Sequence, residues 1–238
     1  MFKSSNPALK SDIYTKLSQY TTDAGPMTLS GTINKTSLLL LLVLGSGVLG
    51  WQVANPAVII AGGLIGLVIG IATAMKQTWS PITAPAYAIC QGITLGALSS
   101  VFEALYSGIV IQAIGLTIAT LFTLLGAYQS GLIKVTEKFK LGVVAATGGV
   151  FAVYMLQFVL RLFGIQLFST GPVGIIISLV IVCIAALNLV LDFDFIETGV
   201  AQQAPGYMEW YSGFGLLVTL LWLYVEILNL LARLRQQD

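Results

Sequence analysis

Histidine is absent from this sequence, and the other charged residues are scarce. Only 9% of the 238 residues are Asp, Glu, Lys or Arg, and the formal net charge is +1. A soluble domain carries roughly 25% charged residues. The absence of histidine removes the usual metal ligand and the side chain that ordinarily titrates near neutral pH. The balanced charge offers no basic surface, so we expect no nucleic-acid partner.

Several catalytic motifs are missing as well. The sequence contains no HExxH motif, no nucleophile–histidine arrangement, no phosphate-binding loop and no GxGD acid pair of an intramembrane protease. Its two cysteines, Cys90 and Cys183, each lie inside an apolar run, which indicates packing residues rather than a disulfide or metal pair. We therefore expect neither an enzyme nor a protein with a bound cofactor.

Apolar residues are what the sequence has in abundance, at 57% of the chain. They form seven long stretches, each near the roughly 20 residues that cross a bilayer as a helix. Barrel strands would be shorter and would alternate in polarity. The predicted fold class is therefore an all-α membrane protein, a seven-transmembrane-helix bundle within residues 37–235. The predicted spans are 37–53, 56–75, 85–106, 109–129, 141–163, 173–194 and 210–232.

Residues 1–36 are polar, rich in Ser and Thr, and lack the apolar segment of a signal peptide. We interpret them as a cytoplasmic tail, partly disordered or with one short helix near residues 10–20. With seven spans, one side of the membrane carries Lys3, Lys10, Lys16, Lys35, Lys76, Lys134, Lys138 and Lys140, and the other carries Arg161, Arg233 and Arg235. This bias predicts a cytoplasmic amino terminus and a carboxyl terminus outside. We further expect a monomeric, multi-pass protein of the cell membrane. The two terminal arginines disagree with this orientation, and a re-entrant last segment would return the carboxyl terminus to the cytoplasm.

Glycines recur at every fourth residue in two predicted helices. They are Gly62, Gly66 and Gly70 in the second, and Gly92 and Gly96 in the third. Small residues at this spacing allow helix backbones to approach closely in lipid. We interpret them as packing positions in a compact bundle rather than as parts of a functional site.

Acidic residues inside the apolar spans are the main functional candidates, because a charge near the membrane centre costs at least about 2.5 kcal/mol. On the last span, Thr219, Trp222, Glu226, Asn229 and Arg233 recur at helical spacing and form one polar face. This face should point toward other helices. Its acid either serves an ion pathway or forms a structural ion pair with the arginine near the membrane edge.

A second group of acids closes the sixth span, in the segment LVLDFDFIET. Asn188 and Asp192 share one helical face, whereas Asp194 and Glu197 share another. We expect Asp192 to continue an inward polar face, and the other two acids to lie at the cytoplasmic mouth or in solvent. The alternative is that all three acids end the helix in water. Because acids are unfavourable at a helix C-terminus, the helix could also continue past Glu197.

Two further charged residues lie near the opposite membrane side. Glu103 follows two serines near the end of the third span, where it either lines a vestibule or caps the helix. Arg161 is expected to extend its side chain to the lipid headgroups.

If two buried acids meet, they titrate as a unit and can exchange protons for a hard cation such as Ca²⁺.

The order of these motifs resembles the Bax inhibitor (transmembrane BAX inhibitor motif) family. LYVEILNLLARL in the seventh span and an acid ending the sixth carry the resemblance, with Asp192 the best match and Asp194 the second. The segments SGTINKTSLLLLL and KQTWSPITAPAYAICQGITLG resemble its prokaryotic branch, which implies a bacterial inner membrane. The resemblance covers about residues 33–235.

The resemblance implies a Ca²⁺-permeable leak channel that is gated by protonation of a carboxylate pair. Here the pair, also the expected cation ligands, would be Asp192 and Glu226. The expected pathway further includes Asn229, Asn188, Asp194, Glu197 and Glu103. Its partners would be H⁺ or Ca²⁺ and the membrane lipid. The alternative hypothesis is a non-conducting regulatory protein that binds other membrane proteins through its polar amino-terminal tail.

Overall fold

A computed structural model describes residues 25–164 and 171–236 of the chain. Its described residues include seven helices long and apolar enough to cross a membrane, and no strand, so the predicted fold class is confirmed. The short helix predicted near residues 10–20 lies outside the described residues. The helices are α2 (Leu29–Gln52), α3 (Pro56–Met75), α4 (Ser80–Leu105), α5 (Ile109–Gln129), α6 (Glu137–Leu162), α7 (Pro172–Ala201) and α8 (Met208–Arg235), with a 3₁₀ turn, η2 (Gln77–Trp79), before α4.

Three helices begin at a residue whose side chain caps the first turn. The Thr28 hydroxyl accepts a hydrogen bond from the Gly31 amide at 3.0 Å, and the Thr136 hydroxyl caps α6 in the same way. The Asn55 carboxamide accepts from the Ala57 amide at 2.9 Å. Each cap satisfies an amide that has no partner inside its own helix. Polar breaks in the sequence therefore become sharp helix starts.

Five of the described helices are longer than their predicted spans, and α2 and α7 extend farthest beyond them. The first begins at Leu29, not at residue 37, because Thr28 caps it and polar side chains in its first turns bond back to the helix; the Thr36 hydroxyl, for example, donates to the Thr32 carbonyl at 2.9 Å. Helix α7 runs to Ala201 rather than to residue 194. Hydropathy marks where a helix leaves lipid, whereas the helix itself continues while its polar side chains find partners.

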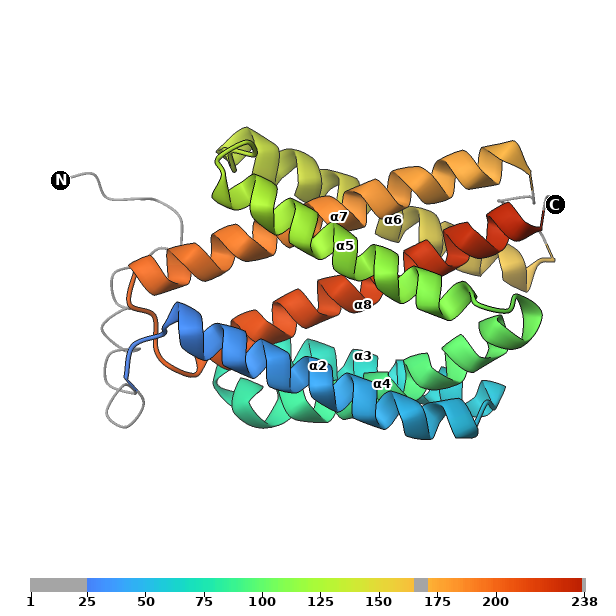
Figure 1. The fold of residues 1–238 in the computed structure, drawn as a ribbon, viewed down its shortest axis with the longest axis horizontal. Helices are drawn as coiled ribbons and strands as arrows, with labels where there is room; N and C mark the ends of the chain where they lie inside the picture. The colour runs from blue at the N-terminus through green and yellow to red at the C-terminus, as the bar shows by residue number, and fades with distance from the viewer. Residues whose placement is uncertain (1–24, 165–170, 237–238) are drawn as a thin grey trace.

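Helix α8 runs through the middle of the bundle (Figure 1) and packs against α2, α4, α5 and α7. Helices α2 and α3 both pack on α4, and α6 packs on α7. We call the membrane side where α2, α4, α6 and α8 begin the proximal side, and the side where they end the distal side. Leucines of α8, including Leu217, Leu223 and Leu228, are fully buried. Lipid-facing side chains lie mainly on the outer helices.

The glycine packing predicted from the sequence is present between α4 and its neighbours. A Cβ atom on Gly96 would lie 2.0 Å from the Gly47 carbonyl oxygen of α2, and one on Gly92 would lie 2.5 Å from the Val43 carbonyl oxygen. A Cβ atom on Gly66 would clash with the Gln91 side chain. These helix backbones are in direct contact, as expected for small residues in lipid.

Candidate functional site

The polar face predicted on α8 points into the bundle. Glu226 is buried at 4% exposure, and one of its carboxylate oxygens accepts two hydrogen bonds. The Tyr154 hydroxyl of α6 donates one at 2.6 Å, and the Trp222 indole donates the other at 3.0 Å. No ion pair within 4.0 Å joins Glu226 to Arg233 in the described part of the chain. The acid is therefore held by neutral donors rather than by the structural ion pair considered above.

A pocket of ≈ 370 Å³ opens beside Glu226, between α6, α7 and α8. We call it the polar pocket. Its lining residues are Tyr154, Gln157, Arg161, Ile177, Ser178, Ile181, Val225, Glu226, Asn229 and Arg233. It lies toward the distal ends of α6 and α8, and Arg161, predicted to reach the headgroups, lines it as well. Three residues of the predicted polar face, Glu226, Asn229 and Arg233, therefore line one pocket. Their side chains offer polar contacts to an ion or a water molecule that enters it.

Asp192 lies on α7, deeper toward the proximal side than Glu226. Its carboxylate faces α8, where a Cβ atom on Gly215 would be 4.0 Å from Oδ1 and where Thr219 lies beside the carboxyl. The described residues offer its buried Oδ2 no hydrogen-bond partner. A buried carboxylate oxygen without a partner is rare in folded proteins and is costly. This oxygen is available to a proton or to a cation.

The two acids of the predicted pair are not in contact in this structure. Asp192 lies level with Thr219, and Glu226 follows seven residues later on α8, about 10 Å along the axis at roughly 1.5 Å per residue. Trp222, whose indole donates a hydrogen bond to Glu226, lies between Thr219 and Glu226 in sequence on the same face of α8. Moreover, the described residues contain no group of three or more acid, Cys or His side chains that could hold a metal ion. The structure therefore places the acids at two successive depths rather than in a shared ligand set.

The other candidates on α7 each have a partner of their own. Asn188 donates from Nδ2 to the Thr147 hydroxyl of α6 at 2.8 Å. Asp194 forms an ion pair with Lys140 at 2.8 Å, and Glu197 accepts a hydrogen bond from the Tyr128 hydroxyl. Asp194 and Glu197 therefore lie near the proximal end of the bundle, away from Asp192, on the separate helical face that their spacing predicts.

Glu103 has the capping role that the sequence left as one of two alternatives. Its carboxylate accepts from the Gly108 amide at 2.5 Å and from the Val110 amide at 3.1 Å, at the first turn of α5. A carboxylate at a helix N-terminus is favourable both as a cap and toward the helix dipole. Glu103 does not line the polar pocket. It stabilises the distal turn between α4 and α5.

One buried acid, Glu209 at the start of α8, escaped the sequence analysis. It is 7% exposed, forms an ion pair with Lys35, and accepts from the backbone amide and the hydroxyl of Thr28, each at 2.8 Å. These contacts join the first turns of α2 and α8 on the proximal side. The sequence does show an acid at the start of an apolar span. It does not show that the partners of Glu209, Thr28 and Lys35, lie more than 170 positions away from it.

Comparison with known proteins identifies the family. The sequence profile of the family described as Bax inhibitor 1 like matches residues 6–236, nearly the whole chain. Neither a curated protein sequence nor a solved structure gives a significant match. The match agrees with the resemblance carried by the sixth and seventh predicted spans. The chain is thus a multi-pass membrane protein, and it belongs to the Bax inhibitor 1 like family.

Proposed function

We propose that the protein is a proton-sensitive leak pathway for cations, with Ca²⁺ as the main permeant ion. The pathway runs between α6, α7 and α8 of a cell-membrane protein whose proximal side is cytoplasmic. The observation that carries the proposal is the position of Glu226, a buried membrane acid on the wall of the polar pocket. Charged groups at such depth are expensive and usually mark ion or proton pathways.

Asp192 provides a second position along the same route. Its Oδ2 is buried without a partner, and Thr219 of α8 lies next to the carboxyl. A carboxyl in this environment holds a proton, or, once ionised, attracts a hard cation that prefers oxygen ligands. The family resemblance implies a gate in which two acids act together. Because the two acids lie at different depths in this structure, we propose that they act in series, with protons exchanged for cations at two depths rather than at one shared pair.

Along α8, Trp222 lies between Thr219, which is beside Asp192, and Glu226. Its indole donates a hydrogen bond to the Glu226 carboxylate and lies on the α8 face between the acid and Thr219. Loss of that bond would free the side chain to move away from the route. We infer that the proton occupancy of Glu226 is coupled to the position of Trp222, and through it to passage of the ion.

The direct test is Ca²⁺ flux into proteoliposomes that contain the purified full chain, measured from about pH 5 to about pH 8. Glu226→Gln should lower the flux about tenfold, since one charge-assisted contact of about 1.5–3 kcal/mol corresponds to such a factor or more. Asp192→Asn should shift the pH at which the flux changes. Glu103→Gln is the matched control, because Glu103 lies outside the polar pocket and should leave the flux unchanged.

Flux that is identical in the wild type, Glu226→Gln and Asp192→Asn across this pH range would overturn the proposal. A wild-type protein that is folded yet conducts nothing would support the non-conducting regulatory alternative. Deletion of residues 1–24 separates the two functions further. A leak pathway should still conduct, because the acids and the polar pocket lie in α6, α7 and α8.

A further inference from the structure

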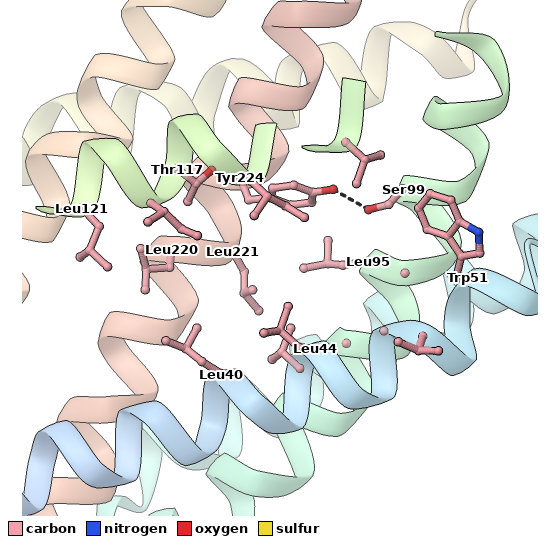
Figure 2. A pocket seen from close by; sticks show the side chains of 18 of the residues that line it. Leu40, Leu44, Trp51, Leu95, Ser99, Thr117, Leu121, Leu220, Leu221 and Tyr224 are labelled. Atoms are coloured by element: carbon pink, nitrogen blue, oxygen red, sulfur yellow. Dashed lines mark hydrogen bonds between the residues drawn. The ribbon is translucent and has the colours of Figure 1, made fainter. Parts of the chain in front are cut away.

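An apolar groove, separate from the polar pocket, lies between α2, α4, α5 and α8 (Figure 2). Its volume is ≈ 600 Å³, within the range of about 300–1,000 Å³ typical of ligand sites. Leucines from four helices surround it, including Leu40 of α2, Leu95 of α4, Leu121 of α5 and Leu220 of α8. We call it the lateral groove.

The lateral groove opens sideways, between α2 and α5. Helix α2 packs on α4 and α8, and α5 packs on α7 and α8, whereas α2 and α5 are not a closely packed pair in the described structure. Leu44 and Val48 line the groove from α2 and are 59% and 61% exposed, and Ile118 lines it from α5 at 49% exposure. The groove is therefore continuous with the apolar surface that the bundle presents to lipid.

Glycines keep the floor of the groove open. Gly47, Gly92 and Gly96 all line it, at the place where α2 and α4 are in backbone contact. The same small residues that bring these helices together thus leave no side chain to fill the space above them. Close packing between α2 and α4 and the hollow beside it have one structural cause.

The polar groups inside the groove already have partners. The Ser99 and Tyr224 hydroxyls are hydrogen-bonded to each other at 2.6 Å (Figure 2), and the Thr117 hydroxyl donates to the Ala113 carbonyl at 2.8 Å. A polar ligand would lose its water hydrogen bonds there and would gain none in return. A hydrocarbon chain meets no such cost, so the lining selects an apolar occupant.

The groove also has a polar end. Trp51 and Gln52, the last residues of α2, line it on the distal side, and tryptophan favours the level of lipid headgroups. From Gln52 inward to Leu40 the wall covers about 18 Å of helix at roughly 1.5 Å per residue. Half of a hydrocarbon core of roughly 30 Å is about 15 Å. The groove is therefore about as long as one leaflet is thick. Its polar end lies on the distal side, where the headgroups of that leaflet lie, and its apolar end points toward the membrane centre.

We propose that the lateral groove binds one acyl chain of a phospholipid from the distal leaflet, with the ester and headgroup end at Trp51 and Gln52. The lipid enters between α2 and α5 and its chain contacts Leu95 and Leu221 in the interior. The site does not depend on the proposed ion pathway, because its contacts lie on the α8 face that carries Leu220 and Tyr224 rather than Glu226.

The test is photolabelling of the purified full chain in liposomes of phosphatidylcholine that carries a diazirine in one acyl chain. In the wild type, label should appear on interior groove residues such as Leu95 and Leu221, as mapped by peptide mass spectrometry. Val48→Trp should fill the mouth and abolish that interior label. Leu49→Trp is the matched control, since Leu49, at 59% exposure against 61% for Val48, lies on the same helix yet does not line the groove. It should keep the label.

Interior label that persists in Val48→Trp, or label found only on outward-facing residues of the wild type, would overturn the proposal. Cross-linking of a Val48→Cys variant to a second copy of the chain, with no interior lipid label, would do the same. Thermal unfolding should show that both tryptophan variants are folded. If Val48→Trp does not fold, Ile118→Trp closes the mouth from α5, with the exposed non-lining Leu116→Trp as its control.

Discussion

Replacing Gly50 by alanine should lower the stability of the bundle by about 3 kcal/mol, within the range known for overpacked cores. The added Cβ atom would lie 2.0 Å from the carbonyl oxygen of Ile93 on α4. That atom belongs to a helix backbone, so it cannot move away as a flexible side chain would. The end of α2 must therefore move away from α4. Thermal unfolding in detergent should show a fall in Tm of roughly 6–12 °C.

The matched control is Gly45→Ala on the same helix. No atom lies within 4 Å of a Cβ atom at Gly45, so this substitution adds no clash. Replacing a mid-helix glycine by alanine also removes an entropic cost of about 0.5–1 kcal/mol. The control should therefore unfold at or slightly above the wild-type temperature. Equal Tm values for the two variants would mean that α2 and α4 are farther apart than the structure shows.

Replacing Glu209 by alanine should have a similarly large effect, about 3 kcal/mol. The carboxylate is nearly fully buried and forms an ion pair with Lys35 while accepting two hydrogen bonds from Thr28. Its removal leaves the ammonium group of Lys35, whose side chain is 27% exposed, and the backbone amide of Thr28 without their partner. Such orphaned groups account for most of the cost of breaking a buried pair. Scanning fluorimetry of the purified protein measures the loss.

A double-mutant cycle with Lys35→Met isolates the ion pair. If Lys35 and Glu209 are coupled, Lys35→Met should cost much less in the Glu209→Ala background than in the wild type. The aliphatic part of the lysine is kept by methionine, so its packing changes little. Additive losses in the two single variants would contradict the pairing. In that case the hydrogen bonds from Thr28 alone would stabilise the buried carboxylate of Glu209.

The architecture was predictable because lipid makes hydropathy a strong signal. All seven spans were located from the length of the apolar runs, and the turns from short segments such as WQVANP, where Asn55 became a cap. The helix ends were less predictable. Helix α7 continues past Glu197 because Lys140 and Tyr128, from other helices, provide partners for its acids. Hydropathy carries no information about such distant partners.

The candidate site was predictable in part. Helical spacing placed Glu226, Asn229 and Arg233 on one face, and all three line the polar pocket. Spacing within one helix cannot say how deep a residue lies relative to a residue on a neighbouring helix. That relation depends on where each helix begins and how it tilts. Spacing therefore did not determine the depth of Asp192 relative to that of Glu226, and in the structure Asp192 lies beside Gly215 and Thr219.

The position of α8 at the centre of the bundle affects how the protein is made. The spanning helices of the described chain that pack against α8, namely α2, α4, α5 and α7, all leave the ribosome before it. Until α8 arrives, Asp192 has no facing Gly215 or Thr219, and Lys35 has no Glu209. The polar contacts of these two residues are therefore completed only when the last span of the chain has been inserted beside them.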